Sequence, residues 1–397
     1  MPDARAPIFD TGPRSRSSPG LYREPSFDFL NRVAGDFWDH PRRLVQEWAD
    51  RISDDGDYAE LRARMRSHSD HAFNSAFLEL YLHETFAAAG WSVTIHPRVA
   101  GTSRRPDFLV ERDGVRVYVE AILPGRAPAK EAATNRRNVL LDTIDAVGDP
   151  NFFLCLDELK DGGTPPSGAP LRRELQHWLK ALDPDAYPDF GNTPSYTWRK
   201  DGWSATFRAI PKAPHARGSV GDGHRSIGIL ADGEAAIVDD APTIRAALAE
   251  KHHAYGDLGA PFVIAVGLYT FDSDRWHSTA AFYGSETLAF DATATDLHEP
   301  RLVRRENGYF GAPPRWSNKN VSGALLINQL QPYSVPRADV TLWRHPDPTH
   351  PLPTELGVPA QEVSLVDGQI RVTCSPLSAS DHFGLSADWP PGEPWPR

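Results

Sequence analysis

Residues 105–122 read RPDFLVERDGVRVYVEAI, and this stretch predicts a β-hairpin. Apolar side chains alternate with polar ones on both sides of Asp113-Gly114, a dipeptide strongly favoured at the centre of two-residue hairpin turns. With these two residues at the centre of a type I′ turn, counting outward along the strands places Asp107 opposite Glu120. The sequence therefore predicts two carboxylates that face each other across neighbouring strands.

The same register divides the hairpin into two faces. One face is expected to carry Phe108, Val110, Val115, Val117, Val119 and Ala121, and the other Asp107, Leu109, Glu111, Arg116, Tyr118, Glu120 and Ile122. Facing carboxylates with Cβ atoms roughly 5 Å apart repel each other, so they need a shared proton or a bound cation. Mg²⁺ is commonly held by one or two carboxylates plus water. Besides a metal ligand, two interpretations remain open: the register of the hairpin differs by one or two residues, or Asp107 simply caps the strand entry after Pro106.

Pro106-Asp107, a hairpin, and then Glu120 two positions before Ile122 together resemble the PD-(D/E)xK motif of the restriction-endonuclease-like nuclease superfamily. The resemblance covers roughly residues 73–157. It departs from the motif at Ile122, which occupies the position of the lysine. It implies an α/β fold with an αβββαβ core and a metal-dependent phosphodiester hydrolase that acts on DNA.

The resemblance also implies the residues of the site. Asp107, Glu120 and the backbone carbonyl of Ala121 are the expected ligands of Mg²⁺ or Mn²⁺. The chain contains seven lysines, so few can replace the missing cation. Lys130, on the helix expected after the hairpin, is the first candidate, because some members of the superfamily carry the lysine there; Lys251 is the second. For each, the more ordinary interpretation is a solvated helix lysine.

Residues 71–89 predict a largely buried helix that ends before Gly90. Glu79 lies within its apolar run, and the resemblance assigns it a supporting role at the metal site; the alternative is a surface residue on the edge of the helix. At about 100° per residue, Glu84 is offset by roughly 140° from Glu79, so we expect it to face solvent.

The predicted elements define four regions. A strand at 91–96, the hairpin, a helix at 130–147 and a strand at 151–156 complete the expected αβββαβ order. We therefore expect an N-terminal arm (to about residue 25, extended or disordered) and helical cap at 1–70, a nuclease-like core at 71–160, a second α/β region at 171–340 with a helical segment near 321–330, and an irregular proline-rich tail at 341–397.

Composition excludes several classes of protein. The longest apolar run, near residues 262–269, is far too short to span a bilayer, and no secretory signal is evident in the first 25 residues, so we expect a cytoplasmic protein without a membrane partner. The net charge of −11 argues against indiscriminate binding to polyanions. Residues 96–140 nevertheless hold nine Arg or Lys against five acids, which suits a metal site that receives phosphate.

Three hypotheses remain. The leading one is a Mg²⁺-dependent nuclease acting on DNA, in defence or repair. The alternative, suggested by Ile122, is a catalytically inactive nuclease-like module that binds nucleic acid or a partner protein. The third is a hydrolase that uses Asp107 and Glu120 directly on a glycan, since carboxylates at roughly 5 Å permit retaining glycoside chemistry.

Overall fold

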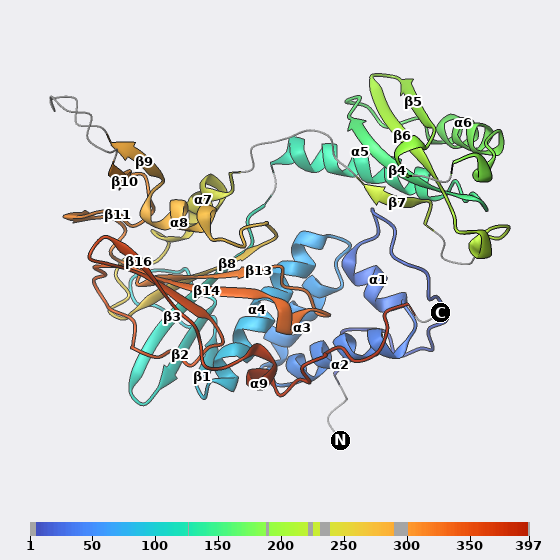
Figure 1. Ribbon diagram of the computed structural model, residues 1–397. Helices are drawn as coiled ribbons and strands as arrows, with labels where there is room; N and C mark the ends of the chain where they lie inside the picture. Colours follow the sequence, from blue (N-terminus) through green and yellow to red (C-terminus); the bar gives the residue numbers. More distant parts are fainter. Residues whose placement is uncertain are drawn as a thin grey trace, which may run out of the picture. The chain divides into compact units, whose positions relative to one another are not determined.

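A computed structural model describes residues 5–125, 127–187, 190–220, 225–230, 239–289 and 301–395. The chain forms two compact units (Figure 1). The first unit comprises Met1–Pro13, Gly35–Gly125 and Val238–Arg397, and the second comprises Arg14–Ala34 and Arg126–Ile237. The second unit is therefore an insertion into the first at two places in the chain.

An eight-stranded mixed sheet organises the first unit, in the order β1-β2-β3-β8-β13-β14-β15-β16. Its strands are β1 (Ser92–Ile95), β2 (Phe108–Arg112), β3 (Val115–Ile122), β8 (Phe262–Leu268), β13 (Gly323–Asn328), β14 (Asp339–Arg344), β15 (Gln361–Val366) and β16 (Gln369–Thr373). Strands β1, β2 and β3 form an antiparallel meander, whereas β8 is parallel to both β3 and β13. The hairpin that carries the two carboxylates is thus joined directly to the central parallel strands.

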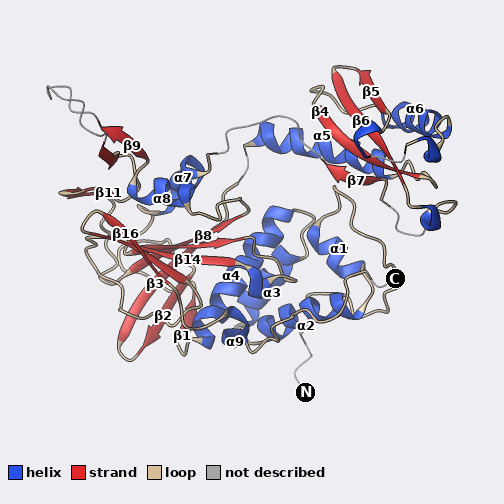
Figure 2. Cartoon of the chain, viewed as in Figure 1, coloured by secondary structure: helices blue, strands red, loops and turns tan. Residues whose placement is uncertain are grey.

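Helices cover both faces of this sheet (Figure 2). They are α2 (Asp36–Asp50), α3 (Asp55–Met65), α4 (Asp70–Ala88), α7 (Ala241–Lys251), α8 (Trp276–Tyr283) and α9 (Ala379–Phe383), with a 3₁₀ turn η4 (Val335–Arg337). Two short ribbons, β9 (Glu286–Ala289) with β10 (Arg301–Arg304) and β11 (Gly311–Ala312) with β12 (Arg315–Trp316), complete the described part of the unit.

The two sheet faces pack against different helices. Tyr118 and Ile122 of β3 share a buried cluster with Ile244 and Leu248 of α7. Helix α4 packs closely against the other face of the sheet at β8. A Cβ atom added at Gly267 would lie 3.0 Å from the Leu78 side chain. The hairpin faces predicted by alternation are confirmed, since side chains assigned to one face share one core.

The predicted helix at 71–89 is confirmed as α4. Ser69 caps its first turn by accepting a hydrogen bond from the backbone N–H of Ala72, and Gly90 follows its C-cap with φ +80°. The expectation that Glu84 faces solvent is wrong, because its side chain is 2 % exposed and pairs with Arg51 and His83. Its two ion-pair partners compensate its charge, so this carboxylate can be buried.

The second unit has its own four-stranded sheet, in the order β5-β6-β4-β7. Its elements are α1 (Ser26–Arg32), α5 (Pro128–Asp145), β4 (Phe152–Lys160), α6 (Gly168–Lys180), β5 (Ser195–Lys200), β6 (Trp203–Pro211) and β7 (Ile227–Leu230), with 3₁₀ turns η1 (Pro184–Ala186), η2 (Phe190–Asn192) and η3 (Pro214–Ala216). Helices α5 and α6 pack on this sheet through a separate apolar cluster that includes Leu140, Leu171 and Trp203.

A mixed α/β fold is confirmed, but the predicted division of the chain differs from the structure. The helix expected at 130–147 and the strand expected at 151–156 exist as α5 and β4, yet both belong to the second unit. In the first unit the helix and strand that follow β3 are α7 and β8, which gives the order α4-β1-β2-β3-α7-β8. Local patterns identified the elements but carried no information about which sheet each strand joins.

Three other expected regions differ. The helical segment expected near 321–330 is β13, a strand buried between β8 and β14; a continuous apolar run does not distinguish a buried strand from a buried helix. The tail expected to be irregular from residue 341 contains β15, β16 and α9, which extend the sheet and cover it. The second α/β region expected at 171–340 is likewise split between the two units.

The helical cap expected within residues 1–70 is present as α1, α2 and α3, although α1 belongs to the second unit. The described residues 5–25 contain no helix or extended strand, and Ile8 and Phe9 are buried. No helix in the described part of the chain is both long and apolar enough to cross a membrane.

Candidate active site

The hairpin has the predicted turn and register. Asp113 and Gly114 both have positive φ, +53° and +79°, as a type I′ turn requires. Phe108 pairs with Val119, so the next position outward places Asp107 opposite Glu120. The turn therefore fixes the register of the two strands, and this register places the two acids opposite each other.

Asp107 and Glu120 are linked through the backbone of the neighbouring strand. The backbone N–H of Asp107 donates to Oε2 of Glu120 at 3.3 Å. In return, the backbone N–H of Ala121 donates to Oδ2 of Asp107 at 2.6 Å. Each carboxylate is thus held by the main chain beside the other acid, and the predicted juxtaposition is present.

Glu120 is buried, with a side chain 3 % exposed, and the end of α7 supplies its other partners. The ammonium of Lys251 lies 2.7 Å from Oε1, and the hydroxyl of Tyr255 donates to Oε2 at 2.6 Å. Together with the backbone N–H of Asp107, these make three donors for a carboxylate with about four acceptor positions. The charge of Glu120 is therefore compensated, and one acceptor position remains for a further ligand.

The strand register indicates the direction of the Ala121 carbonyl. The N–H of Tyr118 donates to Pro261 on the β8 side, so alternate residues of β3, including Ala121, direct their backbone groups towards β2. By the register, the residue opposite Ala121 is Pro106, which has no N–H. The ladder therefore leaves this carbonyl oxygen without a backbone donor, next to both carboxylates.

The electrostatics distinguish the two acids. Burial raises the pKa of Asp107 to about 7, with further contributions from the charges of Glu120 and Glu79, against which the Ala121 N–H and Lys251 act. Burial alone would lower the pKa of Lys251, but its hydrogen bond to Glu120 and the charges of both acids outweigh that effect and raise it. Lys251 is therefore a cation at neutral pH, whereas Asp107 gains or loses its proton near neutral pH.

Glu79 lies on α4 near Asp107 and is held by Arg64 of α3. Two nitrogens of the guanidinium each lie 2.6 Å from a carboxylate oxygen, which is a bidentate pair. Glu79 and Asp107 line a common cavity of about 30 Å³, together with His83 and His96. This volume is sufficient for one ordered water.

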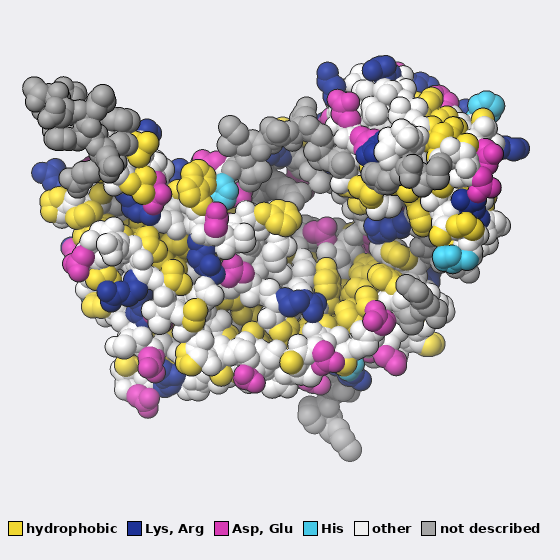
Figure 3. Space-filling model, in the orientation of Figure 1, with side chains coloured by type: hydrophobic (Ala, Val, Ile, Leu, Met, Phe, Trp, Pro, Cys, Tyr) yellow, Lys and Arg dark blue, Asp and Glu magenta, His cyan; other side chains and the backbone are white. Residues whose placement is uncertain are grey.

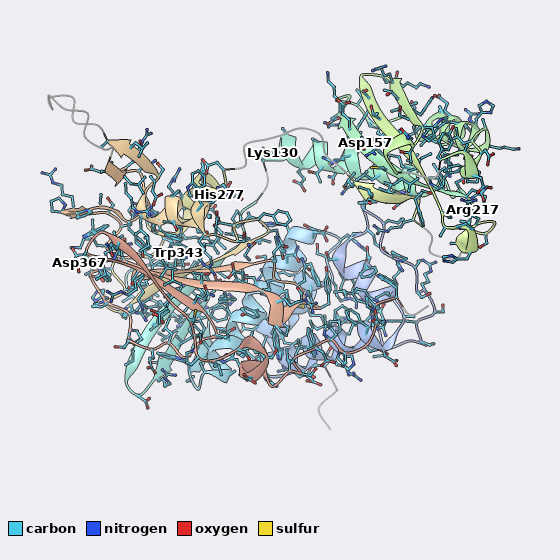
Figure 4. The ribbon with its side chains drawn as sticks, viewed as in Figure 1. Lys130, Asp157, Arg217, His277, Trp343 and Asp367 are labelled. Atoms are coloured by element: carbon cyan, nitrogen blue, oxygen red, sulfur yellow. The ribbon has the colours of Figure 1, made fainter. Side chains whose placement is uncertain are left out.

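The structure distinguishes the two lysine candidates for the missing cation, Lys251 and Lys130. Lys251 contacts Glu120 directly, whereas Lys130 lies at the start of α5 in the second unit with an exposed side chain (Figure 4). Ile122 is buried beneath α7 within the apolar cluster. Of the two candidates, it is Lys251, the last residue of α7, whose ammonium lies beside the acid pair.

Sequence reasoning missed two residues of this arrangement, Tyr255 and Arg64. Tyr255 lies four positions after Lys251 in the stretch EKHHAYG, in the turn that follows α7. That signal had no meaning without the knowledge that α7 packs over β3. Arg64 gave no signal at all among the many arginines of the chain.

The basic neighbourhood predicted for residues 96–140 is weaker than expected. Three of its nine cations, Lys130, Arg136 and Arg137, belong to the second unit, and Arg126 lies outside the described residues. This leaves five Arg against four acids in residues 96–125. Of these, Arg116 pairs with Glu111. On the face drawn in Figure 3, Lys and Arg are interspersed with Asp and Glu and form no single patch.

No three His, Cys, Asp or Glu side chains within the described ranges are arranged to hold a metal ion together. A metal here would rest on Asp107, Glu120, the Ala121 carbonyl and water, which is the kind of ligand set that Mg²⁺ accepts.

Comparisons with known proteins found no relative of this chain. No family model matches the chain, and neither the curated proteins nor the solved structures include a significant match.

Proposed function

We propose that this chain is a divalent-metal-dependent phosphodiesterase of the PD-(D/E)xK type that acts on DNA. The observation that carries the proposal is the contact between Lys251 and Glu120, beside Asp107. It combines two acids and one cation, the groups that metal-assisted hydrolysis of a phosphodiester requires.

The chain's own groups have separate roles in this proposal. Asp107, Glu120 and the carbonyl of Ala121 hold the metal. The bound metal supplies Lewis acidity towards the phosphate and lowers the pKa of a water. Glu79, fixed by Arg64, adds a negative charge near Asp107 and thereby supports binding of a cation there.

Lys251 takes the part of the motif lysine. Its ammonium is charged at neutral pH and lies within hydrogen-bond distance of the metal-binding acid. A cation so placed stabilises negative charge that develops on the phosphate and orients the attacking water. In the proposal, Ile122 is tolerated because α7 delivers the cation from a different element.

The topology of the first unit supports the same assignment. Helix α4, strands β1 to β3, helix α7 and strand β8 give the expected αβββαβ order once the second unit is treated as an insertion between β3 and α7. The acids lie at the start of β2 and near the end of β3, where the resemblance expects them. We propose that these elements are the nuclease-like core.

The test is cleavage of DNA by the purified full chain in Mg²⁺ or Mn²⁺, with EDTA as the blank. We expect metal-dependent cleavage that Asp107→Ala abolishes. Glu111→Gln is the matched control, because Glu111 lies on the same hairpin but pairs with Arg116 at the surface. Unchanged cleavage in Asp107→Ala would refute the assignment.

A second candidate is a catalytically inactive module of the same type that binds nucleic acid or a partner protein. The observation that favours it is the compensated state of Glu120, whose charge is already matched by Lys251. Calorimetry distinguishes the two candidates. An inactive module binds DNA equally well in EDTA and shows no heat of binding with Mn²⁺, whereas metal-dependent turnover excludes it.

A further inference from the structure

The hydroxyl of Tyr255 bridges the two segments that carry the acids. It lies 2.6 Å from Oε2 of Glu120 and 3.1 Å from the carbonyl oxygen of Arg105. Arg105 precedes Pro106-Asp107, so one phenol contacts the β3 acid and the backbone that leads into the β2 acid. Edge-to-face contact with Phe262, at 5.9 Å between ring centroids, fixes the position of the phenol ring.

The contact determines where the Glu120 carboxylate points. Lys251 holds Oε1, and at Oε2 the alternative donor is the longer 3.3 Å bond from the backbone of Asp107. Without the hydroxyl, Oε2 would lose its shorter hydrogen bond and the carboxylate would turn about its bond to the chain. The backbone of Arg105 would also lose its contact with the hydroxyl, which leaves the Asp107 N–H as the donor that joins this segment to Glu120.

We propose that Tyr255 is a positioning residue, which sets the Glu120 carboxylate and the segment leading to Asp107 in the geometry needed to bind a divalent cation. The proposal rests on the proposed function, because it assumes that these acids bind a metal. Tyr255 acts through Glu120 and leaves the metal coordinated by the two acids and the Ala121 carbonyl. Partners of this kind are commonly as important to affinity as the ligands they orient.

The experiment measures Mn²⁺ binding by calorimetry on the full chain, comparing wild type with Tyr255→Phe. The substitution removes the hydroxyl and keeps the ring that packs on Phe262. Tyr196→Phe is the matched control, since the Tyr196 hydroxyl also donates to a carboxylate, that of Glu174, at 2.9 Å but in the second unit. Thermal melting of each variant establishes that it is folded.

We expect Tyr255→Phe to raise the Kd for Mn²⁺ by about tenfold or more, and Tyr196→Phe to leave it unchanged. In cleavage assays, the Mn²⁺ concentration for half-maximal rate should rise by a larger factor than the maximal rate falls.

Two negative results are distinguishable. If wild type binds Mn²⁺ through Asp107 and Tyr255→Phe binds it equally well, the positioning role is overturned while the proposed function stands. If wild type binds no Mn²⁺, the proposed function fails and the positioning role fails with it.

Discussion

The ammonium of Lys251 lies 2.7 Å from Oε1 of Glu120, although 131 positions separate the two residues in the chain. Glu120 is near the end of β3, Lys251 is the last residue of α7, and most of the second unit lies between them in the chain. A cation at a helix C-terminus is also favoured by the helix dipole. The contact therefore joins two elements that the sequence places far apart and gives the acid pair its cation.

Lys251→Ala tests whether this cation takes part in the reaction. We expect the cleavage rate at saturating Mg²⁺ to fall by about 100-fold or more, because one preorganised electrostatic group near the reacting phosphate is lost. The measurement is single-turnover cleavage of a labelled DNA duplex. Lys130→Ala is the control, since Lys130 is an exposed residue of the second unit, and it should cleave like wild type. Equal rates for the two variants would remove Lys251 from the mechanism.

The raised pKa of Asp107 predicts how stability depends on pH without metal. Burial first, and then the charges of Glu120 and Glu79, raise this pKa from 3.8 to about 7 in the folded chain. The folded chain therefore retains a proton that the unfolded chain has lost, and the contribution of this group to the free energy of unfolding decreases as pH rises from about 4 to about 7. Urea unfolding in EDTA at several pH values should show this decrease in wild type and a smaller one in Asp107→Asn. Parallel pH profiles for the two proteins would contradict the assignment.

Glu79→Gln should shift the pH dependence of metal binding. The negative charge of Glu79 contributes to the raised pKa of Asp107, so its removal lowers that pKa, and Mn²⁺ then competes with the proton at lower pH. We expect the midpoint of the rise in Mn²⁺ affinity to move to lower pH, measured by calorimetry across a pH series. Glu47→Gln, on the exposed side of α2, is the control and should leave the midpoint in place. A midpoint unchanged in Glu79→Gln would show that Glu79 does not act on Asp107.

Gly114→Ala tests the turn that sets the register. Gly114 has φ +79°, and an added Cβ would meet no atom within 4 Å, so the cost is backbone strain alone. We expect a loss of about 1 kcal/mol in the free energy of unfolding, measured by urea denaturation. Cleavage at saturating metal should be retained, since the strands that hold Asp107 and Glu120 still pair. A loss of stability several times larger would indicate that the register itself depends on this residue.

The hairpin was predictable because its signals are local. Alternation of side chains and the Asp113-Gly114 turn determine which residues face each other, and no distant contact changes that count. The same holds for α4, with a cap at Ser69 and a stop at Gly90. Local sequence therefore predicted the positions of Asp107 and Glu120 relative to each other.

The sequence could not show which later strand pairs with β3, nor which lysine lies beside Glu120. Both β4 and β8 are apolar runs preceded by a helix, and nothing within either run indicates which one pairs with β3. The choice depends on contacts such as that between Ile122 and α7, which form between residues far apart in the chain. The role of Lys251 and the presence of Tyr255 follow from that choice.

A crystal structure of the full chain grown with Mn²⁺ tests the central claim most directly. We predict anomalous density between the carboxylates of Asp107 and Glu120, within coordination distance of the Ala121 carbonyl oxygen. If no density appears there at saturating Mn²⁺ and Asp107 and Glu120 keep the contacts described above, the proposed metal site is contradicted.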